Sequence, residues 1–158
     1  MLVFSEYQTD TIDLALDFYG YEDCPKNYEF GPSVRDNFVL HYITKGKGVF
    51  RFNNKEIHLE AGDIFLLPKN KVTYYQADAE DPWSYYWIGI SGTKVSDFMR
   101  FSTLHEKGFL KKTEVETERI GQFMEQLVHK AEASKMTSHY QLHLLSQIYE
   151  LLFLISEV

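Results

Sequence analysis

The stretch that decides the fold is residues 42–75, YITKGKGVFRFNNKEIHLEAGDIFLLPKNKVTYY. Short segments in which apolar and polar residues alternate are separated here by residues typical of tight turns or strand ends. These are Gly46-Lys47-Gly48, Asn53-Asn54, Ala61-Gly62-Asp63 and Pro68. Glycine lets the backbone turn sharply, asparagine tolerates a positive φ, and Asp63 is placed to accept hydrogen bonds from nearby backbone amides. The stretch therefore predicts successive β-hairpins.

Strand-like patterns continue on both sides of this stretch. Upstream, residues 12–18 alternate apolar with other side chains and predict an opening strand, while residues 38–44 predict another. Between them, residues 20–36 contain several turn-type pairs and are expected to be loop and short extended pieces. Downstream, residues 72–76 and 83–90 complete the set. About eight short strands at this spacing indicate a β-barrel or a β-sandwich.

The chain divides where period-two alternation gives way to helical spacing. We expect a β-barrel over residues 1–92 and a helical segment over residues 93–158, which makes the fold mainly β with C-terminal helices. Residues 93–101 predict a short helix. A longer helix is expected to begin near Thr113, because Thr113-x-x-Glu116 resembles a capping box.

The last predicted helix, residues 138–156, carries two apolar stripes. The first stripe is Leu144, Ile148, Leu151 and Ile155, and the second is Leu142, Leu145, Tyr149 and Leu152. Two stripes offer more apolar surface than one partner needs, so we expect one to pack on the barrel and the other to meet a second subunit. We assign the first stripe to the interface of a homodimer. The alternative is a helix buried entirely within one subunit.

The charge and the cysteine content exclude several classes of protein. The net charge is −7, and Lys and Arg are scattered rather than clustered, so this chain is not expected to contact DNA directly. A single cysteine, Cys24, allows neither a disulfide framework nor a cysteine-based zinc site. The N-terminus lacks the features of a signal peptide, and the most apolar run, residues 151–155, is too short to span a membrane. We therefore expect a cytoplasmic protein without membrane contact.

Aromatic residues make up 16% of the chain, and many gather in residues 73–76 and 81–87. Because side chains alternate along a strand, Trp83, Tyr85 and Trp87 are expected to share one face. Flat rings suit the C–H face of a sugar, and phenol and indole groups can bind its hydroxyls. The alternative is that these rings simply fill the interior of the barrel.

Two polar residues are added to this candidate sugar site. Arg35, just before a predicted strand, has the forked guanidinium that suits sugar oxygens, although a surface position fits it equally well. His41 lies within the strand predicted over residues 38–44. His41 and Asp17 also match a catalytic base and the group that orients it, but a structural role for each is the simpler interpretation.

Taken together, the hairpins of residues 42–75 resemble the double hairpin of the cupin fold, which implies a jelly-roll-like barrel. A metal-binding cupin has a His-x-His pair and a Glu on the first hairpin, and a further His after the proline turn. Here the glycines are followed by Val49-Phe50-Arg51-Phe52, and Tyr74 or Tyr75 takes the place of the later His. His139 and His143 are four apart on a helix but lack a third ligand. No metal or other cofactor is expected.

A set of motifs extends over most of the chain. They are GYEDCP at 20–25, FGPSVRD at 30–36, LHY at 40–42, GKG at 46–48, AGD at 61–63, LP at 67–68, YYQ at 74–76 and DPWSYYW at 81–87. With these motifs the chain resembles the N-terminal domain of AraC-family transcription regulators, especially those of raffinose, melibiose and multiple-sugar operons in Gram-positive bacteria. The resemblance implies a barrel that encloses a sugar and a helical segment that dimerises. It also implies that Tyr75, Tyr85 and Trp87 contact the sugar, with Arg35 as a nearby candidate.

Members of that family carry two helix-turn-helix motifs beyond this domain, whereas the present sequence stops at Val158. We therefore expect a truncated regulator that binds a sugar (an α-galactoside such as raffinose or melibiose), forms a homodimer and reaches DNA only through the absent half. No catalytic role is expected, because the sequence shows no nucleophile elbow, phosphate loop or close pair of carboxylates. Two other functions remain open, namely a metal-dependent cupin isomerase or dioxygenase, and a constitutive dimerisation module without a ligand.

Overall fold

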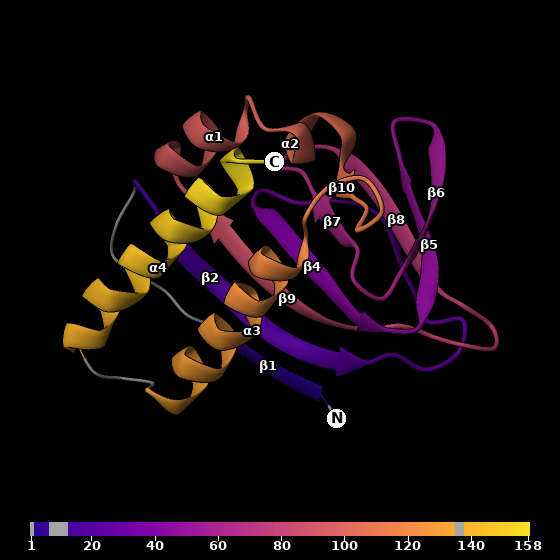
Figure 1. The fold of residues 1–158 in the computed structure, drawn as a ribbon, viewed down its shortest axis with the longest axis horizontal. Helices are drawn as coiled ribbons and strands as arrows, with labels where there is room; N and C mark the ends of the chain where they lie inside the picture. The colour runs from indigo at the N-terminus through magenta and orange to yellow at the C-terminus, as the bar shows by residue number, and fades with distance from the viewer. Residues whose placement is uncertain (1, 7–12, 135–137) are drawn as a thin grey trace.

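The computed structural model describes residues 2–6, 13–134 and 138–158. The described strands form two antiparallel sheets that close into a cupin-type barrel followed by helices (Figure 1), which confirms the predicted fold class. The six-stranded sheet has the order β1 (Leu2–Glu6), β2 (Ala15–Asp23), β9 (Ser84–Ser91), β4 (Phe38–Lys45), β7 (Ile64–Leu67) and β10 (Phe109–Leu110). The four-stranded sheet has the order β3 (Glu29–Val34), β8 (Val72–Ala77), β5 (Lys47–Phe52) and β6 (Lys55–Glu60).

The predicted hairpin turns are confirmed. Asn53 and Asn54 join β5 to β6 with φ values of 54° and 59°, the left-handed conformation that asparagine tolerates. Gly46 has a φ of 75°, and a Cβ added there would lie 2.3 Å from the carbonyl oxygen of Pro82. Only glycine fits this turn, because both the dihedral angle and the close backbone approach exclude a side chain.

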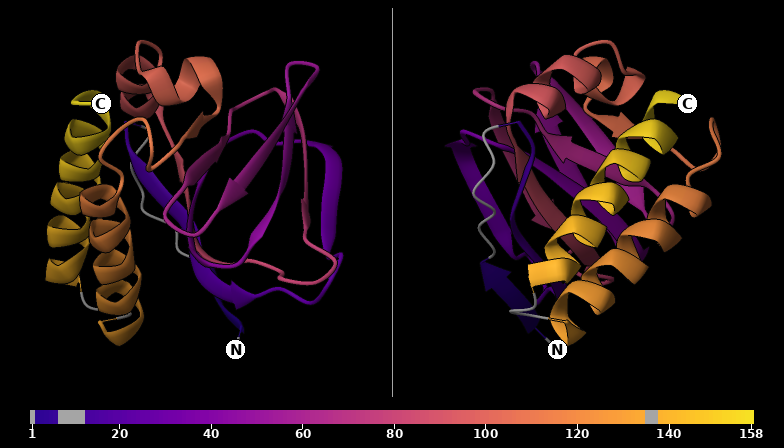
Figure 2. Two further views of the ribbon diagram at one scale, coloured as in Figure 1. Left: turned by 45° about the vertical axis from the view of Figure 1, so that its right-hand side comes forward. Right: turned by 90° about the vertical axis from the view of Figure 1, so that its left-hand side faces the viewer.

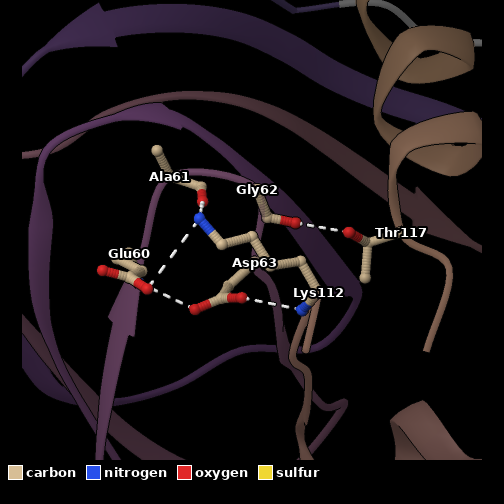
Figure 3. Close-up of polar contacts among 6 residues, drawn as sticks. All are labelled: Glu60, Ala61, Gly62, Asp63, Lys112 and Thr117. Carbon is tan, nitrogen blue, oxygen red and sulfur yellow. Dashed lines mark hydrogen bonds and ion pairs between the residues drawn. The ribbon is translucent and has the colours of Figure 1, made fainter. Parts of the chain in front are cut away.

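Asp63 ties the β6–β7 turn to the segment that precedes the helices (Figure 3). Its carboxylate accepts hydrogen bonds from the backbone N–H of Glu60 at 2.8 Å and of Lys112 at 2.9 Å. The Thr117 hydroxyl adds a hydrogen bond of 2.6 Å to the carbonyl oxygen of Gly62. The turn predicted around Asp63 is therefore also a long-range anchor between the barrel and the start of α3 (Glu118–Ala133).

The prediction of loop and short extended pieces over residues 20–36 is only partly right, because the strands are longer than expected. Strand β2 continues to Asp23, and β3 occupies Glu29–Val34. The described part of β2 begins at Ala15, and residue 12, the predicted start, lies outside the described residues. Turn-type residues concealed the full length of both strands, whose stability comes from pairing with distant partners, β2 with β9 and β3 with β8. Pro32 is accommodated at an irregularity in β3, where the register with β8 shifts.

Four helices follow the barrel in the described chain: α1 (Thr93–Met99), α2 (Thr103–Lys107), α3 (Glu118–Ala133) and α4 (Ser138–Ser156). The bounds of α4 agree with the prediction, and α1 stops two residues earlier than expected. The short helix α2 was not predicted. The Ser102 side chain accepts a hydrogen bond from the backbone of His105 at its start, and Gly108 ends it in the left-handed conformation.

The predicted start of the long helix at Thr113 is wrong, because α3 begins at Glu118. The capping carboxylate belongs to Glu116, which lies outside the helix rather than in its first turn. Its Oε1 accepts hydrogen bonds from the backbone N–H groups of Glu118 at 2.8 Å and Arg119 at 3.4 Å. A carboxylate in this place satisfies N–H groups that the helix leaves unpaired and interacts favourably with the helix dipole.

Helices α3 and α4 lie side by side against the outer face of the six-stranded sheet (Figures 1 and 2). One hydrophobic core fills the space between that sheet and the helices and includes Leu40 and Ile88. A second core lies inside the barrel and includes Val39 and Trp87. Neighbouring residues of one strand therefore belong to opposite cores, as period-two alternation requires.

The assignment of the first stripe of α4 to a dimer interface is wrong. Its residues are at most 1% exposed, and all belong to the core between the helices and the sheet: Leu144, Ile148, Leu151 and Ile155. Contacts within the chain already cover this stripe, so a second subunit cannot reach it. The exposed apolar side chains of α4 are instead Leu142 at 73%, Tyr149 at 44% and Phe153 at 54%. Of the second stripe, Leu142 and Tyr149 are exposed, whereas Leu152 is buried.

No helix in the described ranges combines the length and apolar character needed to cross a membrane.

Candidate ligand-binding site

A cavity of about 390 Å³ lies inside the barrel, between the two sheets. Its lining is mainly aromatic and apolar, with a few polar groups, which is the usual character of a small-molecule site. The lining residues are Phe18, Glu22, Tyr28, Phe30, Arg35, Val39, His41, Leu67, Tyr75, Tyr85 and Trp87. Five of the six residues predicted to bind ligand are therefore brought together around one space.

Strand alternation places the aromatic wall. On β9, Tyr85 and Trp87 face the cavity with ring centroids 5.8 Å apart, while Tyr86 between them faces α3. Tyr75 approaches from β8 of the other sheet, and its ring centroid lies 6.2 Å from that of Tyr85. His41 is paired with Trp87 across β4 and β9, and its ring lies 4.9 Å from Tyr85.

Trp83 does not line the cavity, although it lies on the same face of the chain as Tyr85 and Trp87. Its indole is fully buried in the barrel core and stacks on Phe65, with ring centroids 5.2 Å apart. Gly48 provides the space, because a Cβ at that position would lie 2.5 Å from the Trp83 ring. For this residue the alternative interpretation applies, and the ring fills the interior.

Arg35 lies at the cavity rather than on an unrelated surface. Its guanidinium sits 5.1 Å above the centroid of the Phe18 ring, and its Nε donates a long hydrogen bond of 3.5 Å to Asn37. Glu22 joins the same lining, and burial raises the pKa of its carboxyl group. The two residues give the cavity one cation and one carboxyl group among its described lining residues.

The sequence interpretation missed six of the lining residues. Two are Val39 and Leu67, and the other four come from β2, β3 and the turn between them: Phe18, Glu22, Tyr28 and Phe30. Three of the four lie in residues 20–36, which were predicted to be loop and short extended pieces. A period-two pattern was available in Phe18, Gly20 and Glu22, but glycine and acidic residues weaken a strand signal.

The polar groups on the aromatic wall are uncharged at neutral pH. Burial lowers the pKa of His41 to about 3, and burial raises the pKa values of Tyr75 and Tyr85 far above the usual value for tyrosine. His41 is 2% exposed, and its Nδ1 has no hydrogen-bond partner. The wall therefore offers neutral donors and acceptors, which suit hydroxyl groups.

Asp17 and His41 have separate partners. Asp17 accepts hydrogen bonds from Asn37 at 3.2 Å and from Ser91 at 3.0 Å. His41 stacks on Phe65 inside the barrel. The structure thus gives no contact of the kind that a base and its orienting group require. Within residues 2–6, 13–134 and 138–158, no group of three or more His, Cys, Asp or Glu side chains is placed to hold a metal ion.

A larger hollow of about 760 Å³ lies outside the barrel, between the β5–β6 hairpin and the start of β8. Its lining includes four charged side chains at the surface, Arg51, Lys55, Glu56 and Lys71. Small-molecule sites are usually enclosed and predominantly apolar. The interior cavity is therefore the stronger candidate.

The family model of the AraC-like ligand binding domain matches residues 15–152, which include strands β2 to β10 and most of the helical segment. The chain belongs to the AraC-like ligand-binding domain family. Among curated relatives of this domain, the Msm operon regulatory protein of Streptococcus mutans is 47% identical over 105 residues, 66% of this chain and 38% of the relative. The raffinose operon transcriptional regulatory protein of Pediococcus pentosaceus is 44% identical over 100 residues, which are 61% of this chain and 36% of the relative. The lactose operon transcription activator of Staphylococcus xylosus is 33% identical over 98 residues, which are 62% of this chain and 35% of the relative. The matched part of the AraC-like domain spans little more than a third of each relative.

Solved structures show a likeness in fold alone. Protein YhaK from Escherichia coli has a TM-score of 0.50 and 15% identity, over 58% of this AraC-like domain and 45% of that chain. A cupin superfamily protein from Desulfitobacterium hafniense has a TM-score of 0.43 and 14% identity, over 58% of this domain and 78% of that chain.

Proposed function

We propose that this AraC-like domain binds a saccharide in the barrel cavity and thereby regulates a DNA-binding transcription factor for carbohydrate use. The observation that carries the proposal is the convergence of Tyr75, Tyr85 and Trp87 on one cavity, with Arg35 beside them. Aromatic faces and neutral hydrogen-bonding groups match the alternating C–H and O–H surfaces of a sugar. The names of the relatives, all regulators of operons, support a regulatory role rather than a catalytic one.

The ligand we propose is a galactoside, with raffinose and melibiose as the first candidates. Two relatives are named for raffinose and lactose operons, and both of these sugars end in a galactose unit. The cavity of about 390 Å³ lies near the lower end of the range for small-molecule sites, roughly 300–1,000 Å³, which favours a short saccharide.

We further propose that the domain works as a homodimer in the cytoplasm, with residues 1–92 binding the ligand and residues 93–158 joining the subunits. The surface that supports this is the exposed face of α4, formed by Leu142, Tyr149 and Phe153. Its residues are spaced by seven and four, so they share one side of the helix. DNA would be contacted only by a part of the regulator beyond this chain.

Isothermal titration calorimetry tests the proposed function. Raffinose, melibiose, lactose and galactose are titrated into the folded domain, and maltose, which contains only glucose, is the comparison. Saturable binding of a galactoside, with a negative heat-capacity change from buried apolar surface, is the expected result. A folded sample that binds none of these sugars contradicts the proposal. Metal analysis of the same sample addresses the alternative of a metal-dependent enzyme.

A further inference from the structure

We infer that His41 is a specificity-determining residue that forms a hydrogen bond with one hydroxyl group of an uncharged ligand. This inference rests on the proposed function, because it concerns the same cavity. Among the described lining residues, His41 holds the one buried side-chain nitrogen or oxygen atom that lacks a hydrogen-bond partner. The side chain is almost completely buried, so bulk water does not satisfy it.

An unpaired buried nitrogen is costly for the empty domain. Leaving a buried polar group unsatisfied costs about 1–3 kcal/mol, and such groups are rare in native proteins. The position does not need a polar residue for packing, because its ring contacts are aromatic and the nearest centroid, that of Phe65, lies 4.2 Å away. A ligand hydroxyl that pairs with the part of the ring that lines the cavity would offset this cost, which explains why an imidazole occupies the position.

The neighbouring rings hold the imidazole in one orientation. Phe65 stacks on it with an interplanar angle of 7°, and Tyr85 meets it edge-on at 89°. Tyr75 contacts it from the opposite sheet, with centroids 5.3 Å apart. A ring fixed in this way offers its hydrogen-bonding atoms in set directions, which is what discrimination between sugar epimers requires.

The protonation state of His41 suits a hydroxyl rather than an anionic group. Burial lowers the pKa of His41 to about 3. The Val39 backbone opposes this shift, although it forms no hydrogen bond of good geometry with Nδ1. A neutral imidazole has one donor and one acceptor, as a hydroxyl group does. Arg35 is the one cation in the described lining, and Glu22 lies in the same lining, so a phosphorylated ligand would find little compensation for its charge.

The inferred role predicts how deoxygenated ligands bind. A site that pairs with a hydroxyl group rejects the analogue that lacks it, because the polar group of the protein is then left unpaired. Galactose and its 2-, 3-, 4- and 6-deoxy derivatives are the probes. We expect the wild-type protein to bind one of the deoxy derivatives at least tenfold more weakly than galactose. We expect His41→Phe to bind that derivative and galactose equally.

The variants separate a binding role from a structural one. His41→Phe keeps an aromatic ring that can stack on Phe65 but removes both ring nitrogens. We expect at least a tenfold loss of galactose affinity with an unchanged or higher melting temperature, because the unpaired nitrogen disappears. His41→Gln keeps a donor and an acceptor and is expected to retain more affinity than His41→Phe. His58→Phe, a matched substitution at an exposed histidine of β6, is expected to change neither property.

Three results overturn the inference. An unchanged affinity in His41→Phe removes the role of the imidazole. A loss of affinity that parallels a lower melting temperature in both His41 variants indicates a structural role instead. If the wild-type protein binds none of the sugars, the proposed function itself fails, and the role of His41 fails with it; the wild-type titration alone distinguishes that case from the other two.

Discussion

At the scale of single residues, the face of a strand and the position along it decide what an aromatic side chain does. Trp83 and Trp87 lie on the same face of one segment, four residues apart, yet Trp83 is fully buried in the core while Trp87 lines the cavity. The difference comes from their neighbours, because Gly48 leaves room for the Trp83 ring against Phe65. The two tryptophans therefore form a natural pair of probe and control.

Ligand binding is expected to change the fluorescence of Trp87 and not that of Trp83. The chain has two tryptophans, so Trp83→Phe leaves only Trp87 emitting, and Trp87→Phe leaves only Trp83. Titration with a bound galactoside should shift the emission of Trp83→Phe and leave that of Trp87→Phe unchanged. Loss of the indole face should also weaken binding by up to about tenfold, from the roughly 0.5–1.5 kcal/mol typical of specific aromatic contacts. Equal responses from both variants would contradict the assignment of Trp87 to the site.

His41 is expected to make the domain less stable below pH 6.5. Its pKa is about 3 in the folded protein and about 6.5 in an unfolded chain. Between these two pH values, the unfolded state binds a proton that the folded state excludes. The free energy of unfolding then falls by up to about 1.4 kcal/mol for each pH unit below 6.5, until pH approaches 3.

Urea unfolding of the wild-type protein and His41→Phe at several pH values between 4 and 6.5 measures this effect. The stability advantage of the variant should grow as the pH falls. The other titratable groups that share the cavity, Glu22, Tyr75, Tyr85 and Arg35, are present in both proteins, so their contributions largely cancel. Parallel pH profiles would show that His41 accepts its proton in the folded state.

At the scale of elements, local signals predicted some segments and failed for others. The turn of the β5–β6 hairpin and the bounds of α4 were predicted correctly, because an Asn-Asn turn and sustained helical spacing are local features of the sequence. Strand β3 was expected only as part of a segment of loop and short extended pieces, since it contains Gly31 and Pro32 and depends on pairing with β8. The dimer stripe was misassigned because periodicity shows which residues share a helix face, but not which neighbour covers that face.

The start of α3 depends on a contact that sequence spacing did not reveal, the anchor at Asp63. Asp63→Ala is expected to lower the free energy of unfolding by about 2–3 kcal/mol, because it leaves the backbone N–H groups of Glu60 and Lys112 without their charged acceptor in a buried place. Chemical denaturation measures the loss. Asp78→Ala is the control, since its carboxylate also accepts two backbone hydrogen bonds, but at the surface, where water replaces it with a much smaller loss. Similar losses in both variants would contradict the anchor.

At the scale of the whole molecule, one sheet separates the cavity from the helices. Tyr85 and Trp87 of β9 face the cavity, while Tyr86 between them contacts His129 of α3, with its hydroxyl 3.0 Å from Nε2. On β2, Phe18 lines the cavity, and the next residue, Tyr19, donates a hydrogen bond of 2.7 Å to Glu132 of α3. The family match over residues 15–152 spans this whole arrangement. A residue of the cavity wall is thus next in sequence to a residue that contacts α3, and α3 packs against α4, which carries the proposed dimer surface.

The proposed dimer is tested on the exposed face of α4. Phe153→Glu places a charge within the proposed apolar contact, where it would have to be desolvated without a partner, so we expect the dimer to dissociate into monomers. Light scattering coupled to size-exclusion chromatography measures the mass across a range of concentrations. Phe98→Glu is the matched control, because Phe98 of α1 is 53% exposed, against 54% for Phe153, and lies on a different helix. A wild-type protein that stays monomeric, or a Phe153→Glu variant that stays dimeric while Phe98→Glu dissociates, would move the subunit interface away from α4.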